Sequence, residues 1–215
     1  VGADMPSSKM ALELAKQYEF VYAALGVHPS EVEGLTEDDM AWISSHAAHE
    51  KVAAIGEIGL DYHWPEPKPA LQKQWFRRQI ELAKEVKLPI IVHSRDAAEP
   101  TMQIIQETKA YECGGVIHCY SYSPEMAEEY VKMGFFIGMG GVLTFKNAKK
   151  LVRCAERIPL SSIVLETDCP YMAPEPNRGK RNDSSQLIYV AQKLAEIKGI
   201  TAEEVKQVTT ENAHR

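Results

Sequence analysis

The sequence lacks the features that place a chain in a membrane or build it from repeats. No stretch approaches the roughly 18 consecutive apolar residues that a membrane-spanning helix needs. No signal peptide is visible, because the chain opens on the polar segment GADMPSSK. Internal repeats, linkers and low-complexity tracts are also missing, so we expect one domain over residues 1–215.

The sequence is poor in cysteine and has no excess of basic residues. Its four cysteines, at positions 113, 119, 154 and 169, show no CxxC spacing, which favours free thiols in a reduced, cytoplasmic protein. The 24 basic and 30 acidic side chains give a net charge of −6. This balance excludes a protein that coats nucleic acid through a basic face, but it permits a nuclease that grips a strand end with a few local cations.

Short apolar segments predict buried strands, and amphipathic segments between them predict helices. The predicted strands are residues 20–27, 52–60, 88–93, 114–119, 134–139 and 162–168. The predicted helices are residues 7–18, 37–46, 68–86, 97–109, 124–133, 148–158, 184–198 and 202–214. Thr36, Ser123 and Thr201 precede three of these helices and are predicted N-caps.

Alternating strands and helices predict an α/β fold with a parallel sheet. A (β/α)8 TIM-type barrel and an open doubly wound sheet both fit six strands. A barrel needs eight strands and about 250 residues, so this chain would lack its first βα unit and most of the second strand. Because the chain starts at Val1, and Val1–Gly2 could be the tail of a strand, we expect an N-terminal truncation of about 40 residues.

Four predicted strands end in residue types that bind metal ions. These residues are Glu57, His93, His118 and Asp168, separated by 36, 25 and 50 positions. Each alone is more often a hydrogen-bonded or capping residue, but strand ends converge on one mouth of a barrel, where active sites lie. The set of imidazoles and carboxylates suits Zn²⁺, Mn²⁺ or Mg²⁺. The sequence therefore predicts a divalent metal site.

Other polar residues follow the same strand ends. Asp61 and His63 come just past the second strand, and we expect them to orient metal ligands. Glu166 lies close to Asp168, and we expect only one of these two carboxylates to point inward. His28 ends the first strand, and we place it near the substrate and not on the metal.

A basic loop follows Asp168. Arg178, Lys180 and Arg181 come after prolines that stiffen the loop and restrict its neighbours. Such a charge run is usually a solvated face. Cations that leave the same strand end as a metal ligand also suit a grip on phosphate or carboxylate, with arginine contacting two oxygens at once.

Six segments carry a resemblance to a known family. GEIGLDYHW, LPIIVHSRDA, GGVIHCYS, GGVLTFKNAKK, VLETDCPYMAP and RGKRN occur in this order. They resemble the signature segments of the TatD-related metal-dependent deoxyribonucleases, which belong to the amidohydrolase-like barrel superfamily. The similarity runs from about residue 22 to the end of the chain.

The resemblance implies a (β/α)8 barrel that hydrolyses DNA phosphodiester bonds, often at single-stranded 3′ ends, with two Mg²⁺, Mn²⁺ or Zn²⁺ ions per complete site. It implies that Glu57 bridges two metals and that His93 and His118 hold the second. Asp168 would hold the first metal and help activate the attacking water. The loop that carries Arg178 would lie near the substrate phosphate.

Two departures from the family pattern stand out. The family begins with a strand that carries a His-x-His pair, and no such pair occurs here, since His46 and His49 have the wrong spacing. The family also has a ring-bearing residue before the loop arginine. Here Asn177 takes that place, and it can hydrogen-bond a phosphate oxygen but cannot act as a general acid.

Three other functions remain open from the sequence. The chain could be a barrel hydrolase that cuts an ester, lactone or amide, such as an aminoacyl group misattached to tRNA. It could be a metal-binding or nucleic-acid-binding protein without turnover, because it lacks the His-x-His pair. It could also be a structural fragment, since a six-stranded barrel has exposed strand edges.

Overall fold

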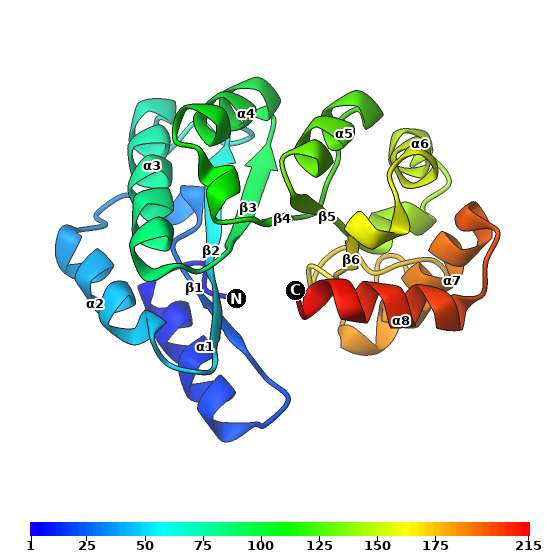
Figure 1. The fold of residues 1–215 in the computed structure, drawn as a ribbon, viewed down its shortest axis with the longest axis horizontal. Coiled ribbons are helices and arrows are strands. Elements are labelled where there is room, and N and C mark those ends of the chain that lie inside the picture. Colours follow the sequence, from blue (N-terminus) through cyan, green and yellow to red (C-terminus); the bar gives the residue numbers. More distant parts are fainter. The chain divides into compact units, whose positions relative to one another are not determined.

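The computed structural model describes residues 1–215, which form two compact units. Unit 1 is Val1–Gly115 and unit 2 is Val116–Arg215. Their helices and strands are labelled in Figure 1. That the whole chain acts as one domain stays a prediction. None of the helices combines the length and the apolar character needed to cross a lipid bilayer.

Unit 1 is built from three neighbouring parallel strands and four helices. Strand β1 pairs with β2, and β2 pairs with β3. Helix α1 packs on β1, α3 on β2 and α4 on β3. The elements are α1 (Met5–Gln17), β1 (Ala23–Leu25), α2 (Glu37–Ala47), β2 (Val52–Asp61), α3 (Pro69–Val86), β3 (Ile90–Arg95) and α4 (Ala98–Glu107).

Unit 2 continues the alternation. Its strands β5 and β6 are parallel neighbours, α5 packs on β5, and α8 packs on β6 and α7. Strand β4 begins at the last residue of unit 1. The elements are β4 (Gly115–Ile117), α5 (Pro124–Lys132), β5 (Phe135–Met139), η3 (Gly141–Thr144), α6 (Lys149–Arg157), β6 (Ile163–Leu165), α7 (Leu187–Lys198) and α8 (Ala202–Ala213).

The order of strands in the sheet is the order in the chain, from β1 to β6. A doubly wound sheet contains a point where the strand order reverses. No reversal occurs here, which removes that alternative and agrees with the barrel type of α/β fold. The eight predicted helices and six predicted strands are all present.

Local signals explain where several helices begin. The Thr36 side chain accepts a hydrogen bond from the Asp39 amide, and Asp39 accepts one from the Thr36 amide, which completes a capping box. Ser123 and Thr201 cap α5 and α8 in the predicted way. Each such cap typically stabilises a helix by about 1 kcal/mol.

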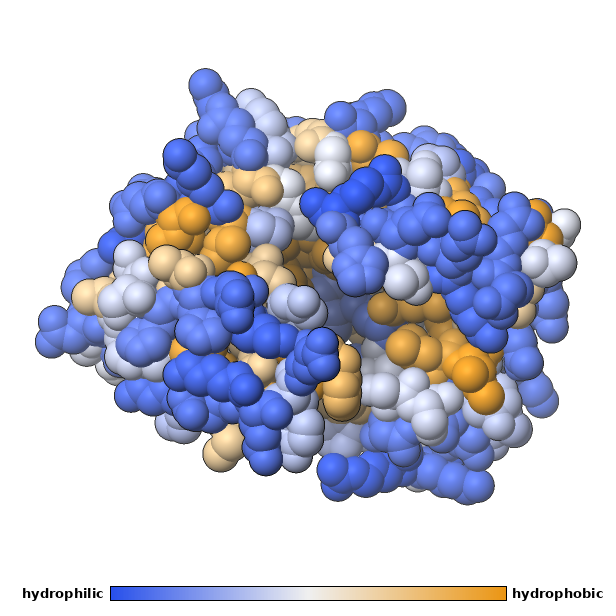
Figure 2. Space-filling model, turned by 60° about the horizontal axis from the view of Figure 1, so that its bottom comes forward, coloured by the Kyte–Doolittle hydropathy of each residue, from blue (hydrophilic) through white to orange (hydrophobic).

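Each unit has its own apolar core. Ile55, Ile58 and Phe76 are at most 1% exposed in unit 1, and Tyr130 and Phe135 are equally buried in unit 2. The face shown in Figure 2 is mostly hydrophilic, with hydrophobic residues in separate patches. The alternation of buried sheet residues and amphipathic helices therefore accounts for both units.

Three strand boundaries differ from prediction and affect the site. The prediction that Glu57 and His93 end their strands is wrong, because Glu57 lies inside β2 and His93 lies inside β3, which runs to Arg95. Strand β2 runs to Asp61, so Asp61 is its last residue and does not lie past its end. Strand β6 ends at Leu165, and Asp168 lies three residues beyond it.

In unit 1, residue Gly2 donates to the Ala24 carbonyl at 2.9 Å and accepts from the Glu57 amide at 3.0 Å.

Candidate metal centres

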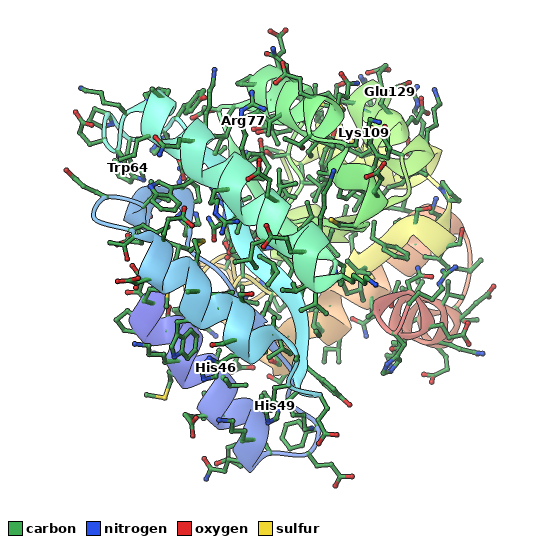
Figure 3. All side chains as sticks on the ribbon, turned by 60° about the vertical axis from the view of Figure 1, so that its left-hand side comes forward. His46, His49, Trp64, Arg77, Lys109 and Glu129 are labelled. Atoms are coloured by element: carbon green, nitrogen blue, oxygen red, sulfur yellow. The ribbon has the colours of Figure 1, made fainter.

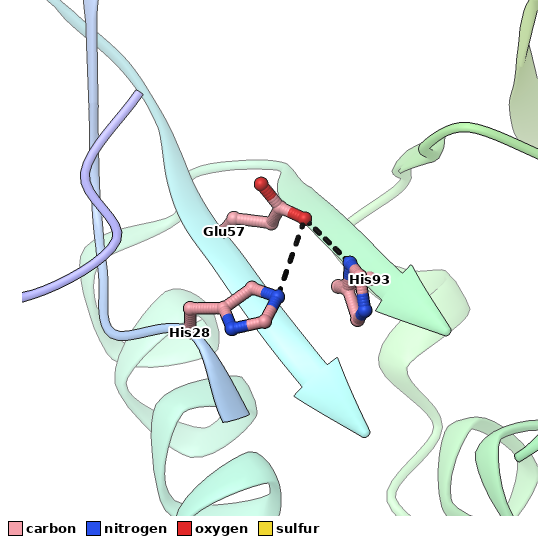
Figure 4. A group of neighbouring side chains, drawn as sticks. All are labelled: His28, Glu57 and His93. Atoms are coloured by element: carbon pink, nitrogen blue, oxygen red, sulfur yellow. Dashed lines mark hydrogen bonds and ion pairs between the residues drawn. The ribbon is translucent and has the colours of Figure 1, made fainter. Parts of the chain in front are cut away.

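The first candidate centre lies in unit 1 and contains His28, Glu57 and His93, which are drawn in Figure 4. Their possible ligand atoms all lie within 4.8 Å of one another. Glu57 Oε1 is 2.8 Å from His93 Nδ1 and 3.9 Å from His28 Nε2. The side chains come from β2, from β3 and from the turn after β1. Neighbouring strands therefore bring together residues that are 65 positions apart in the chain.

A second carboxylate fixes the other side of the His93 ring. His93 Nε2 lies 3.1 Å from Asp61 Oδ2, so the ring sits between Glu57 and Asp61. Burial works to lower the pKa of His93, but the bonds to Asp61 and Glu57 outweigh it and raise that pKa. Burial works to raise the pKa of Asp61, but hydrogen bonds from His93 and the His63 amide lower it. Asp61 thus orients the ring, as the sequence predicted.

His28 differs from His93 in the state of its ring. The Ser30 amide donates to His28 Nδ1 at 3.2 Å, and the Ser30 hydroxyl lies 2.7 Å from the same nitrogen. A neutral imidazole that accepts at Nδ1 carries its proton at Nε2. The nitrogen that faces Glu57 is therefore a donor, which suits a bond to an anionic oxygen better than a bond to a metal ion.

Two buried glutamines of α3 hold the backbone around this centre. Gln72 accepts from the Asp61 amide and donates to the Asp61 carbonyl, both at 2.8 Å. Gln79 accepts from the Val27 amide at 2.8 Å and donates to its carbonyl at 3.0 Å. Each glutamine is 1% exposed, so their amide groups replace water for backbone groups that no strand partner satisfies. Gln79 therefore fixes the backbone of Val27, the residue before His28, and Gln72 fixes the end of β2; these two pairs of hydrogen bonds are called the glutamine clamps below.

The second candidate centre lies in unit 2 and contains His118, Cys119 and Asp168, with possible ligand atoms within 4.8 Å. His118 directly follows β4, and its Nε2 is 3.7 Å from Asp168 Oδ1. Cys119 and Asp168 have φ angles of +44° and +51°, which are uncommon for residues other than glycine. Such backbone strain concentrates at functional sites.

The expectation that only one carboxylate points inward is wrong. Glu166 Oε2 is 2.6 Å from His118 Nδ1 and accepts from the Cys119 amide at 3.1 Å. Positions two apart on an extended chain share a face, so alternation places Glu166 and Asp168 on the same side. The backbone turns beyond Leu165, and both carboxylates reach His118. Like His93, His118 lies between two carboxylates.

The residues of both centres fit divalent cations. Each centre offers one imidazole nitrogen beside a carboxylate oxygen, with the opposite ring nitrogen bound to a second carboxylate. This arrangement is typical of histidines that bind metal ions. In unit 2, Glu166 Oε1 is buried and has no hydrogen-bond partner, but Glu166 lies outside the group formed by His118, Cys119 and Asp168. Cys119 adds a softer donor, which zinc accepts.

The basic loop is accessible to an anion. Arg178 and Lys180 are exposed, and the Arg178 guanidinium stacks over the Phe145 ring at 4.3 Å. Asn177 bonds Gln186 at 2.8 Å and accepts from Lys180 at 3.3 Å.

Asn182, which is 2% exposed, ties this loop to Asp168. Its side-chain amide donates to the Thr167 carbonyl at 2.6 Å and to the Tyr171 carbonyl at 2.7 Å. The loop is therefore held on both sides of Asp168.

The predicted site residues fall into two sets. Unit 1 brings together Glu57, His93 and His28, and unit 2 brings together His118 and Asp168. That the two sets meet at one mouth stays a prediction. His46 and His49 lie at the end of α2 and beyond it, where Figure 3 shows them at the surface.

The sequence reasoning missed Cys119, dismissed Glu166, and overlooked three buried amides at Gln72, Gln79 and Asn182. The paired acids of the segment ETD could have identified Glu166, and two glutamines seven residues apart on the apolar face of α3 could have identified the clamps.

Comparison with known proteins identifies the family. Residues 1–215 match the family described as TatD related DNase. The chain belongs to this family. Similar proteins include YabD of Bacillus subtilis, named an uncharacterized metal-dependent hydrolase, which is 50% identical over all of this chain and 84% of its own length. YcfH of Escherichia coli, named in the same way, is 37% identical over all of this chain and 80% of its own.

Solved structures agree with this assignment. YjjV, a TatD homologue from Escherichia coli, has a TM-score of 0.89 and 32% identity over 96% of this chain and 80% of that one. A TatD-family hydrolase of Entamoeba histolytica has the same fold, with a TM-score of 0.86 and 24% identity over 99% of this chain and 81% of that one. The predicted α/β fold of the TIM-barrel type is thus confirmed, and the protein is a metal-dependent hydrolase of the TatD family.

Proposed function

We propose that this protein hydrolyses phosphodiester bonds of DNA from a strand end, with divalent metal ions held by Glu57, His93, His118 and Asp168. The observation that carries the proposal is the repeated arrangement of a histidine between two carboxylates, once in each unit. Membership of the TatD-related DNase family supports DNA as the substrate. The ion is Mg²⁺, Mn²⁺ or Zn²⁺, because histidine and carboxylate ligands suit all three.

Each residue has a role that its surroundings support. A bound divalent cation supplies Lewis acidity and lowers the pKa of water. Glu57 and Asp168 present carboxylate oxygens next to His93 and His118, whose far nitrogens are held by other acids. Asp168, with a side chain 34% exposed, can accept the proton of the attacking water at a carboxylate oxygen.

The groups that contact the substrate are hydrogen-bond donors. They either face solvent or lie in the candidate centre of unit 1. The exposed Arg178 guanidinium offsets charge on the phosphoryl oxygens, an effect typically worth a few kcal/mol in such sites. Asn177 and Lys180 lie in the same loop and add hydrogen-bond donors. His28 Nε2–H donates to a substrate oxygen near Glu57.

The test combines metal binding with DNA cleavage. Protein stripped of metal is given Mn²⁺, Mg²⁺ or Zn²⁺ and a single-stranded oligonucleotide labelled at one end, and the products are separated by length. We expect shortening from one end only when metal is present. Glu57→Ala should lose cleavage and the metal held with His93, whereas Glu81→Ala, an exposed change on α3, should keep both. Cleavage by Glu57→Ala at the parental rate would refute the ligand assignment.

A second experiment distinguishes a phosphodiesterase from an ester or amide hydrolase. Arg178→Ala should slow DNA cleavage strongly, because the charge on the phosphoryl oxygens loses its partner. A hydrolase of small neutral esters would be indifferent to this change. Parallel assays on p-nitrophenyl acetate and on bis(p-nitrophenyl) phosphate therefore decide between the two reactions.

A further inference from the structure

Unit 2 contains a charged hollow that neither candidate centre uses. It has a volume of about 460 Å³ and lies beside α6. Its lining includes four cations and one acid: Lys146, Lys149, Arg153, Lys193 and Glu156. A volume of this size accommodates a small ligand or a segment of a polymer. The strong local excess of positive charge contrasts with the net charge of −6 of the whole chain.

Three of these cations form no ion pair in the protein. Lys193 pairs with Glu196 at 2.9 Å, but Lys146, Lys149 and Arg153 are exposed and form no ion pair.

Arg157, one turn further along α6, shows the opposite arrangement. It binds two acids of α5, Glu125 and Glu128. The cations that line this hollow from α6, Lys149 and Arg153, are therefore free of the ion pairs that neutralise Arg157.

The placement of these cations works against the stability of α6. Lys149 and Arg153 stand four residues apart on one helix face, where like charges repel. Lys149 also lies in the first turn of α6, where the helix dipole disfavours a cation and where Ala148 provides no side-chain cap. A bound anion would offset both effects at once.

The hollow is joined to the loop that carries the predicted phosphate grip. Phe145 lines the hollow, and the Arg178 guanidinium stacks on its ring. Thr144 also lines the hollow, and its hydroxyl accepts a hydrogen bond from the Glu175 amide at 2.8 Å. The segment after Asp168 therefore packs directly on one wall of the hollow.

We infer that this hollow binds the sugar-phosphate backbone of a single DNA strand, at nucleotides that precede or follow the bond to be cleaved. The inference rests on the proposed function for the identity of the polymer. The positive side chains of the hollow, which shares Phe145 with Arg178, complement the negative charge of a phosphodiester chain. The surface binds backbone and reads no base, so it acts on all sequences alike.

The test measures binding without cleavage. A fluorescein-labelled oligothymidylate of about 15 nucleotides, in EDTA, is titrated with the parent and with Lys146→Glu/Arg153→Glu, over a range of KCl concentrations. Binding of the double variant should weaken by about tenfold at low salt. The slope of log Kd against log salt should fall by about 0.7 for each phosphate group that the variant no longer neutralises. Thermal unfolding should show no loss of stability, because both side chains are exposed and Arg153→Glu removes the repulsion with Lys149.

Lys150→Glu is the matched control. Lys150 is exposed on the same turn of α6 and lines a neighbouring hollow with Ser123 and Pro124, a hollow that Arg153 also lines but Lys146 does not. Equal weakening by Lys150→Glu and Lys146→Glu would overturn the inference, because diffuse charge would then explain binding. Equal competition by polyglutamate of the same length would also overturn it, because the surface would then bind acidic polymers in general.

A second assay separates this inference from the proposed function. Hydrolysis of bis(p-nitrophenyl) phosphate with Mn²⁺ reports the reaction on a substrate that has no neighbouring nucleotides. The double variant should hydrolyse this substrate at the parental rate but show a raised KM for the oligonucleotide. Unchanged oligonucleotide affinity in the double variant overturns the inference, whereas a parent inactive on both substrates contradicts the proposed function.

Discussion

Glu166→Gln tests whether a carboxylate behind His118 prepares that ring for metal binding. In the parent, Glu166 Oε2 lies 2.6 Å from His118 Nδ1, so Nδ1 carries the proton and Nε2 presents its lone pair toward Asp168. Glutamine preserves shape but removes the charge. It can also turn its NH₂ group toward the ring, which would shift the proton to Nε2 and block the metal-binding nitrogen.

The expected loss follows from the geometry around His118. Replacing the carboxylate partner of a metal-binding histidine typically lowers metal affinity by about 10- to 100-fold. This corresponds to about 1.4–2.7 kcal/mol of binding free energy. The variant also places an NH₂ group where the buried Glu166 Oε1 has no partner, so the free energy of unfolding should fall by about 1–3 kcal/mol.

The assay is isothermal titration of metal-stripped protein with Mn²⁺ or Zn²⁺, accompanied by ¹⁵N NMR of the histidine ring nitrogens. NMR reports the tautomer of His118, which a change in packing alone would not alter. Glu156→Gln, an exposed change on α6, is the matched control and should bind like the parent. Metal affinity of Glu166→Gln within twofold of the parent, with an unchanged His118 tautomer, would refute the reasoning.

Three further predictions concern buried groups. Gln79→Leu removes both bonds to the backbone of Val27, so urea denaturation should show a loss of about 2–4 kcal/mol, and Gln74→Leu, an exposed change on α3, should have little effect. Burial raises the pKa of the Cys154 thiol to about 11, so the parent should lose more stability than Cys154→Ala as pH rises from about 8.5 through 11, and equal losses would contradict this. Gly138→Ala would place a Cβ 2.6 Å from Glu166 Oε2, so its metal affinity should fall as in Glu166→Gln, and unchanged affinity would show that the carboxylate can move.

The fold could be predicted because its signals are local and periodic. Every predicted helix and strand exists, and the caps at Thr36, Ser123 and Thr201 are confirmed. Strand ends were less certain, since β2 continues to Asp61 and β6 stops at Leu165. The apolar pattern marks burial but not the residue at which strand pairing ends, which depends on the neighbouring strand.

The candidate centres could be predicted in part. Imidazoles and carboxylates near four strand ends predicted that Glu57, His93, His118 and Asp168 lie together. The structure brings Glu57 close to His93 and His118 close to Asp168, and the meeting of the two pairs stays a prediction. The partner of His118 was not predicted, because Glu166 follows the strand and its direction depends on a backbone turn. Asp168 adopts a φ of +51°, a conformation that no pattern of apolar residues indicates.

The buried side-chain amides were not predicted from the sequence. Gln72, Gln79 and Asn182 look like surface residues by composition, and each is at most 2% exposed. These side chains form hydrogen bonds to backbone groups that have no partner in a strand, such as the amide of Val27 and the carbonyl of Thr167. A single sequence does not show which backbone groups will lack a strand partner, so these residues become visible only in the folded chain.

The two centres share one physical construction. In each, a histidine lies between two carboxylates, and a buried amide holds the backbone beside one of them: Gln72 at Asp61 and Asn182 at Thr167. The acids set the proton on the ring, and the amides set the position of the acids. A buried amide forms its bonds without a charge to neutralise, so it can sit beside a cation site without competing for the cation. Glu166, which contacts His118 from behind, and the buried amides therefore depend on the folded backbone and were among the residues that escaped prediction.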